Sequence, residues 1–174
     1  MSKILKLAYT YRDELQEKYS EIIFKDKYKY YNCCNWWGYE VKLPEDSYNS
    51  LDFVSVDKND EVIGYLRACI DRSSNFVDSL AVINFYDINI TFSKDFYKFL
   101  IDLFTKFNFR KVSFTVVIGN PAEKLYNKYI EKYGGRIVGI EKEDVKLQDG
   151  EYYDKKLYEI FREDFLKHYK LKKK

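Results

Sequence analysis

The sequence contains few of the residues that build disulfide frameworks or metal sites: its 174 residues include three cysteines and one histidine. Cys33 and Cys34 are neighbours in the chain and Cys69 stands alone, so there is no CxxC motif and no cysteine–histidine cluster. This pattern excludes a disulfide scaffold and the usual zinc sites, and we expect no bound metal. It is also typical of a cytoplasmic protein, in which thiols stay reduced.

Long apolar runs and a large excess of one charge are missing as well. No run approaches the ~18 residues of a membrane span, and the N-terminus lacks the apolar core of a secretion signal. We therefore expect a soluble protein with no membrane partner. The formal net charge is +2, from 30 Lys and Arg against 28 Asp and Glu, and this small excess does not favour a general nucleic-acid binder.

The only basic run lies at the C-terminus, at residues 167–174. Such runs are usually solvated and mobile, so we assign these residues to a basic tail and place a single domain at residues 1–166. A ribosomal or nucleic-acid contact of the tail is the less favoured alternative. The lone His168 lies in this run, where a surface position is favoured over a catalytic one.

Prolines and glycines are also scarce, at two and seven, and they form no linker, which together with the chain length predicts one domain. A domain of this size buries a core without disulfides or metals. Aromatic residues are instead abundant, with 18 tyrosines and 13 phenylalanines. Many of the tyrosines must therefore bury the ring and leave the hydroxyl in water.

The densest aromatic region is residues 25–50, which we interpret as a short helix followed by a loop. Its large rings stand among polar residues: Tyr28, Tyr30, Tyr31, Trp36, Trp37 and Tyr39. Two explanations stay open at this point. The segment is either a lid that packs onto the core or an aromatic wall that contacts an acceptor substrate.

The first half of the chain otherwise predicts a short strand at residues 4–8 and a helix at 11–24, with Thr10 as a candidate N-cap. Three strands follow, at residues 53–57, 62–71 and 76–86. The turns between them are short, which favours an antiparallel meander.

The clearest helix covers residues 94–107, because its apolar residues recur at helical spacing and Ser93 stands where a cap belongs. A strand at residues 110–118 comes next. A helix between two strands is a crossover, so this strand can pair in parallel with the strand at 76–86.

A second strong helix starts at Asn120, a preferred N-cap, with Pro121 at the first helical position and Glu123 placed for a capping box. Gly134 and Gly135 end it. The remaining elements are a hairpin of residues 136–147 and 152–162 around Asp149-Gly150, and a short terminal helix or tail at 162–170.

This order of elements, an α+β arrangement with a central mixed sheet flanked by helices, resembles the fold of the GNAT superfamily of N-acyltransferases over essentially the whole chain. The local likeness is greatest where Asn120 opens a helix, Ala122 and the pair Leu125-Tyr126 follow, and Gly134 leads into the next strand. The resemblance implies an acetyl-CoA-dependent N-acetyltransferase. Its acceptor would be an amine of a protein, a peptide or a small molecule, and a homodimer is compatible with this reading.

The resemblance also implies a site. The pantetheine arm of acetyl-CoA would run beside the backbone of three residues of one strand, and three further residues would contact the cofactor: Val82, Ile83, Asn84, Ser93, Lys94 and Asn120. Tyr126 would act as the acid that protonates the leaving thiolate. Each role has a structural alternative, since Asn120 is an ideal helix cap and Tyr126 lies on an apolar stripe.

The sequence departs from the family pattern in two places. The family places glycines where its central helix meets the pyrophosphate, whereas residues 92–97 contain none, and Asp95 would face phosphate with a like charge. Lys94, Thr91 and Ser93 would compensate in part. No glutamate stands on the strand at 76–86 to act as general base, and Asp78 and Asp87 are the nearest acids. A catalytically inactive module with this fold, used for binding or regulation, is therefore the alternative function.

Overall fold

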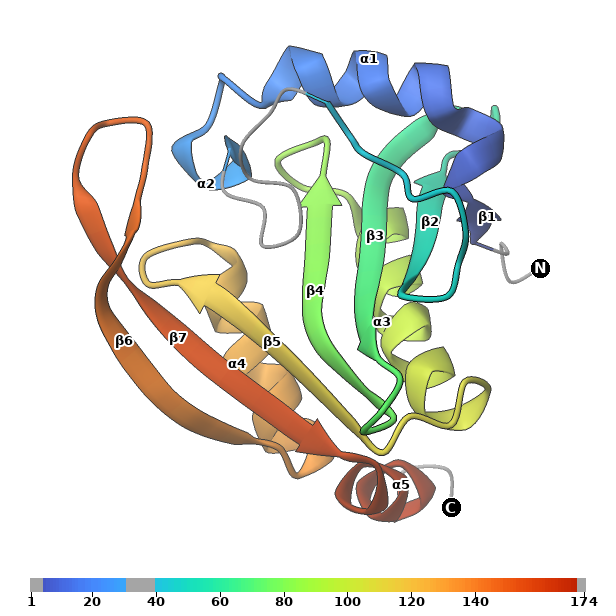
Figure 1. Ribbon diagram of the computed structural model, residues 1–174, viewed down its shortest axis with the longest axis vertical. Helices are drawn as coiled ribbons and strands as arrows, with labels where there is room; N and C mark the ends of the chain where they lie inside the picture. Colours follow the sequence, from blue (N-terminus) through green and yellow to red (C-terminus); the bar gives the residue numbers. More distant parts are fainter. Residues whose placement is uncertain (1–4, 31–39, 172–174) are drawn as a thin grey trace.

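The computed structural model describes residues 5–30 and 40–171, which form one seven-stranded mixed sheet with helices packed on it (Figure 1). The strand order is β1-β2-β3-β4-β5-β7-β6. The elements, in chain order, are β1 Lys6–Leu7, the 3-10 helix η1 Ala8–Tyr11, α1 Arg12–Ile22, α2 Lys27–Tyr30, β2 Ser50–Val56, β3 Val62–Asp71, β4 Phe76–Asn84, α3 Ile90–Thr105, β5 Lys111–Val117, α4 Ala122–Tyr133, β6 Arg136–Lys146, β7 Tyr152–Phe161 and α5 Arg162–Leu171.

The predicted meander is confirmed, because β2, β3 and β4 pair in sequence and antiparallel. The predicted crossover is confirmed too: β4 and β5 are parallel, with α3 between them. Their pairing covers only Phe76 with Lys111 and Val77 with Val112. The next residue of β4, Asp78, is skipped by the register with β3, which marks a bulge that bends the strand. Beyond this point β4 and β5 diverge.

Helices cover both faces of the sheet around β2, β3 and β4, whereas β6 is largely exposed. On one face α1 covers β2, β3 and β4, with Leu15, Tyr19 and Tyr65 fully inaccessible. The other face holds the larger core, in which α3, α4 and α5 share a continuous set of aromatic rings. Phe96 of α3 lies 6.0 Å from Tyr126 of α4, and Phe104 of α3 stacks 4.5 Å from Phe165 of α5, measured between ring centroids.

Two predicted helix starts are wrong. Thr10 does not cap α1, because it lies inside η1 and its hydroxyl donates to the Leu7 carbonyl. Ser93 does not cap α3 either, since the helix begins a turn earlier and the Asn89 side chain accepts from the Phe92 N–H at 3.1 Å. Asparagine is as good an N-cap as serine, so residue preference alone does not distinguish Asn89 from Ser93.

The earlier start of α3 also corrects the expectation for Asp95, which does not face the N-terminal opening of the helix. Its side chain is buried, with the residue 7% exposed, and accepts a hydrogen bond from the Ser55 hydroxyl of β2 at 2.6 Å. The carboxylate therefore joins the helix to the sheet.

The helix α4 begins at Ala122, one residue later than predicted, and the predicted capping box does not form. The side-chain oxygen Oδ1 of Asn120 accepts a hydrogen bond from the Ala122 N–H at 2.9 Å, as a capping side chain does. Glu123, however, accepts from the N–H of Gly119 at 3.1 Å rather than from that of Asn120, which is bonded to Val117. The helix ends, as expected, at Gly134 in the left-handed conformation with φ of 69°.

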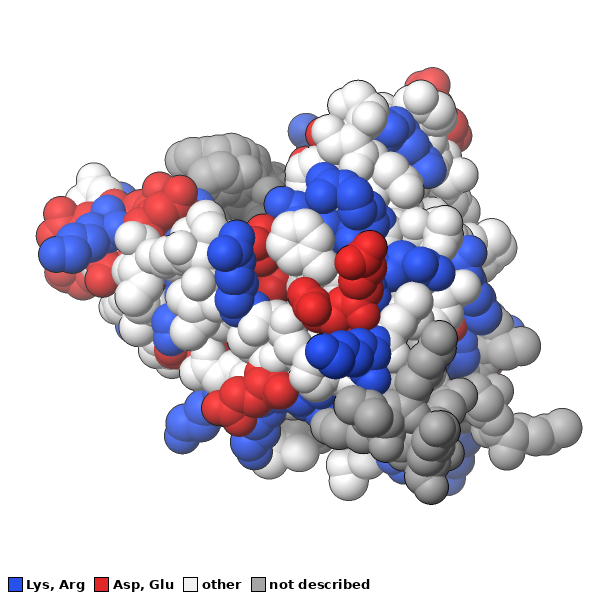
Figure 2. All heavy atoms as spheres, turned by 90° about the horizontal axis from the view of Figure 1, so that it is seen from below, with Lys and Arg blue, Asp and Glu red and all other residues white. Residues whose placement is uncertain are grey.

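At the C-terminus the helical alternative holds, because α5 continues to Leu171 through part of the run assigned to a tail. Phe165 is fully buried, and Tyr169 packs against the same core. The His168 Nδ1 lies 2.8 Å from the Asp164 carbonyl, one turn back. On the face seen in Figure 2, basic and acidic side chains lie among one another rather than in separate areas.

Candidate functional site

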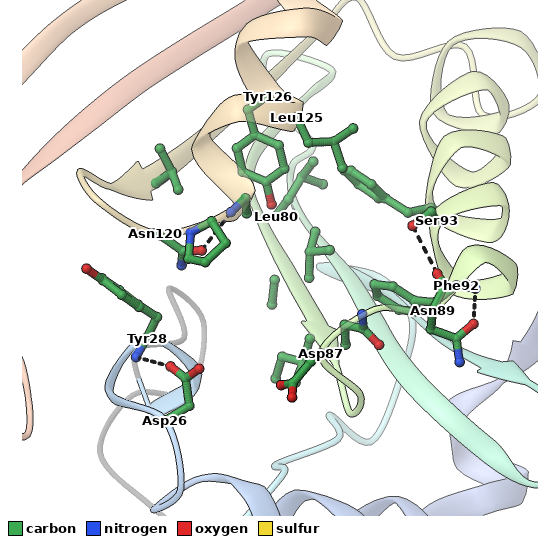
Figure 3. A pocket seen from close by; sticks show the side chains of 18 of the residues that line it. Asp26, Tyr28, Leu80, Asp87, Asn89, Phe92, Ser93, Asn120, Leu125 and Tyr126 are labelled. Carbon is green, nitrogen blue, oxygen red and sulfur yellow. Dashed lines mark hydrogen bonds between the residues drawn. The ribbon is translucent and has the colours of Figure 1, made fainter.

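A cavity of about 530 Å³ opens where β4 and β5 diverge (Figure 3). Its walls come from these two strands, the loop after β4, the first turns of α3 and α4, and the start of α2. The residues that line it are Asp26, Tyr28, Leu80, Ala81, Val82, Ile83, Asn84, Tyr86, Asp87, Ile88, Asn89, Phe92, Ser93, Phe96, Thr115, Val116, Val117, Asn120, Pro121, Ala122, Leu125 and Tyr126. The volume is in the range of small-molecule sites.

Six of the seven predicted site residues meet in this cavity: Val82, Ile83, Asn84, Ser93, Asn120 and Tyr126. They come from β4, α3, the loop before α4, and α4 itself, so the fold joins segments that lie far apart in the chain. Lys94 is the exception. It is exposed on α3 and does not line the cavity.

The β4 backbone borders the cavity along one edge. Its other edge is paired with β3 as far as Asn84, whereas its pairing with β5 stops at Val77. Alternate backbone N–H and C=O groups of Val82, Ile83 and Asn84 therefore face the gap beyond the end of the β5 pairing. An extended ligand with amide groups can bind such an edge as an added strand.

Tyr126 belongs to the core and to the cavity at once. The residue is 7% exposed, and its ring packs edge-on against Phe114 with 5.1 Å between centroids. Its hydroxyl points into the cavity (Figure 3). The two interpretations that the sequence left open are therefore compatible, since the ring can be core while the hydroxyl meets a ligand.

Tyr129, one turn further along α4, is equally buried at 7% exposure but does not line the cavity. Burial, followed by the nearby Tyr97, raises the pKa of its hydroxyl to about 12. Tyr129 therefore stays protonated and has no access to a ligand, which makes it a natural comparison for Tyr126.

Of the two acids considered as a base, Asp87 lines the cavity and Asp78 does not. Asp78 is exposed at the bulge and accepts from the Ser79 hydroxyl at 3.1 Å. Sequence reasoning missed a second acid of the cavity, Asp26, whose carboxylate accepts from the Tyr28 N–H at 2.8 Å. An aspartate directly before a short helix was a recognisable cap, but nothing in the sequence places that helix at β4 and β5.

The aromatic segment contributes Tyr28 to the cavity wall. Four of its other rings, Tyr31, Trp36, Trp37 and Tyr39, lie outside the described residues, so the choice between lid and acceptor wall stays a prediction for them.

A salt bridge fixes α2 beside the β6–β7 hairpin, 122 residues away in the chain. Lys27 Nζ lies 2.8 Å from Asp149 Oδ2 and 2.5 Å from the Tyr153 hydroxyl. That hydroxyl also donates to Asp149, at 2.6 Å. We call this group the α2–hairpin clasp (Lys27, Asp149, Tyr153), and it holds Tyr28 at the cavity.

No protein-family model and no curated protein matches the sequence. Solved structures do match. A chimera of the Vibrio cholerae spermidine N-acetyltransferase SpeG with hSSAT superposes with a TM-score of 0.70 at 18% identity, over 96% of this chain and 99% of that chain. The Vibrio cholerae enzyme in complex with CoA and spermine gives 0.59 at 21% identity, over 88% and 77%. At identities this low the superpositions show a shared fold and nothing further, and the mixed sheet flanked by helices matches the GNAT fold.

Proposed function

We propose that this chain, which has the GNAT acetyltransferase fold, is an acetyl-CoA-dependent N-acetyltransferase acting on an amine. The observation that carries the proposal is the cavity itself. It combines the β4 edge at Val82, Ile83 and Asn84, beyond the end of the β5 pairing, with a tyrosine hydroxyl that points into the same space. A binding site for a thioester and a proton donor for its sulfur would thereby lie together.

The residues present fit the pantetheine arm of acetyl-CoA. The open edge of β4 at Val82, Ile83 and Asn84 offers main-chain groups to the two amides of the arm, and the apolar side chains of the cavity suit its methylenes. Asn120 and Ser93 line the same cavity and stay predicted contacts. Lys94 is exposed outside the cavity, so its predicted contact with the outer part of the cofactor would be screened by water and would add little affinity. When bound, acetyl-CoA supplies an acetyl group activated as a thioester.

In the proposed reaction the amine nitrogen forms a bond to the acetyl carbon, and the carbon–sulfur bond breaks. A β4 N–H that faces the gap would stabilise the negative charge on the acetyl oxygen. Tyr126 would donate its proton to the leaving sulfur. The proton lost by the amine would pass through water to Asp87, the acid on the cavity wall that is also exposed.

The acceptor is proposed to be a cationic amine. Asp26 and Asp87 both line the cavity, and Figure 3 shows their carboxylates on the same side of it, below Tyr126 in that view. One similar structure is a spermidine N-acetyltransferase in complex with CoA and spermine, a polyamine. The acceptor amine would belong to a protein, a peptide or a small molecule.

The competing proposal is a module that keeps the fold without catalysis. The observation that favours it is the glycine-free segment between β4 and α3, whose one acid, Asp87, lines the cavity. Such a module would bind a ligand in the cavity but would not release thiol from acetyl-CoA.

One experiment separates the two proposals. Thermal unfolding is measured with and without CoA, and thiol release from acetyl-CoA is followed with a panel of amines that includes spermidine. A ligand at 100 times its Kd stabilises the fold by about 2.7 kcal/mol, which a melting curve detects easily. Stabilisation with turnover supports the enzyme, and stabilisation without turnover on any amine supports the module.

Two further expectations remain proposals. One is a cytoplasmic location. Among the described helices, none is long and apolar enough to cross a membrane. The second is a homodimer, for which the outer strand β6 is the proposed contact. It exposes three apolar side chains, Ile137, Val138 and Ile140.

A further inference from the structure

The charges around the cavity do not suit a polyanion. Among the described residues that line it there is no lysine, arginine or histidine, whereas Asp26 and Asp87 are both present. Lys27 lies next to the lining residues, but its ammonium is held by the clasp with Asp149 and Tyr153. A ligand with several phosphates would therefore meet two carboxylates at this cavity.

The helix N-termini at the cavity are occupied by the protein's own side chains. At α3 the Asn89 side chain accepts from the Phe92 N–H at 3.1 Å. At α4 the Asn120 side chain accepts from Ala122 at 2.9 Å, and the Glu123 carboxylate accepts from Gly119 at 3.1 Å. Free N–H groups are what makes a helix N-terminus bind anions, and these caps remove part of that capacity.

The loop between β4 and α3 also hinders a close approach of phosphate to the backbone. Its residues 85–89 include no glycine, so every one carries a side chain. The side chains that reach solvent here are mostly apolar, with Tyr86 45% exposed and Ile88 89% exposed, and Ile90 at the start of α3 is 70% exposed. A surface of this kind suits an uncharged group rather than a diphosphate.

We infer that the thioester donor is recognised through its pantetheine arm, and that its nucleotide diphosphate adds little to the affinity. Donors that end at pantetheine, without the nucleotide, are then substrates of the same site. The inference rests on the proposed function, since it concerns the donor of that reaction. The features that remain for binding are the open β4 edge and the apolar wall of Leu80, Phe96 and Leu125.

The test measures the dissociation constants of three probes for the full chain by calorimetry: CoA, pantetheine, and adenosine 3′,5′-bisphosphate as the nucleotide end alone. We expect CoA and pantetheine to agree within about tenfold, or about 1.4 kcal/mol, and the bisphosphate not to bind. Raising the salt concentration should leave CoA affinity unchanged or increase it, because salt screens the repulsion from Asp26 and Asp87. CoA affinity more than about tenfold above that of pantetheine and falling with salt would overturn the inference.

Variants give an independent readout. Asp87→Asn should tighten CoA binding and leave pantetheine binding unchanged, because only CoA carries phosphates. Glu131→Gln is the matched control, since it removes the same charge from an exposed site on α4 that does not line the cavity. A selective loss of CoA affinity in Lys94→Gln would contradict the inference, because it would identify a phosphate contact.

The two ways of failing can be told apart. If neither CoA nor pantetheine binds, the proposed function is wrong and the inference falls with it. If CoA binds strongly and pantetheine does not, the proposed function stands and the inference alone is wrong.

Discussion

Tyr126 presents its ring to the core and its hydroxyl to the cavity, so the two contributions can be separated by removing one oxygen. In Tyr126→Phe we expect turnover to fall by roughly 10²- to 10⁴-fold, the usual contribution of a positioned proton donor. The free energy of unfolding should change by about 1 kcal/mol or less, because the ring contacts remain. Thiol release and denaturant unfolding measure the two effects.

Tyr129→Phe is the control for this experiment, since Tyr129 is as buried as Tyr126 but does not line the cavity. Its turnover should equal that of the wild type. If Tyr126→Phe also keeps turnover within about twofold, Tyr126 is not the general acid, and water must protonate the thiolate.

Three residues of the cavity show which contacts can be predicted from the sequence and which cannot. Tyr126 and Asn120 were found because they lie close together in one helix start, a local pattern. Asp26 was not found, because it enters the cavity through α2, and the contact of α2 with the hairpin joins residues 122 apart. Contacts of this length depend on the complete fold, and no local signal encodes them.

Among the elements, α3 contributes its first turn to the wall of the cavity, and Asn89 caps that turn. Asn89→Ala should destabilise the protein by about 0.5–2 kcal/mol, the usual effect of losing an N-cap. Ser93→Ala should cost less, because its hydroxyl only donates to the Asn89 carbonyl within the first turn. Denaturant unfolding of the two variants measures the difference, and an equal loss in both would contradict the assignment of the cap.

The same helix explains one error of the sequence interpretation. Starting α3 at residue 94 places Asp95 in the first turn, where acids commonly face the helix opening. With the observed start at Ile90, Asp95 falls in the second turn and turns inward to Ser55. The apolar periodicity predicted the buried face of α3 correctly, but periodicity does not indicate the first residue of a helix.

The α2–hairpin clasp should open in acid. The Asp149 carboxyl accepts from Lys27 and Tyr153, and these bonds lower its pKa from 3.8 to about 2. Because the folded-state pKa is lower than that of the unfolded chain, the stabilisation is complete above the ordinary pKa and is lost as the pH falls towards 2. Fluorescence of the aromatic residues around α2, followed against pH, would detect the opening.

Asp149→Asn provides the comparison for this prediction, because its amide no longer titrates. The wild type should show a fluorescence transition between about pH 4 and pH 2, and the variant should lack it. An identical pH profile for both proteins would mean that the clasp does not hold α2 in place.

At the scale of the whole molecule, the sheet ends at β6, whose outer edge is available to pair with a strand of a second copy of the chain. The sequence of β6 is complementary to itself: an antiparallel pairing centred between Val138 and Gly139 sets Arg136 opposite Glu141 and Ile137 opposite Ile140. We expect a homodimer through this strand. Ile140→Glu should weaken the dimer by about tenfold or more, measured by sedimentation. A monomer at all concentrations for the wild type would refute this assembly.

The short pairing of β4 with β5 divides the chain at Asn108, with β1 to β4 on one side and β5 to β7 on the other. Few sheet hydrogen bonds cross that division, whereas aromatic rings cross it repeatedly, as between Phe96 and Tyr126 or Phe104 and Phe165. Two separately made fragments, cut in the loop at Asn108, would therefore reassemble by burying rings rather than by completing a sheet. The affinity of the two fragments should fall on cooling, as apolar association does. This mode of reassembly makes the protein a candidate for a split reporter.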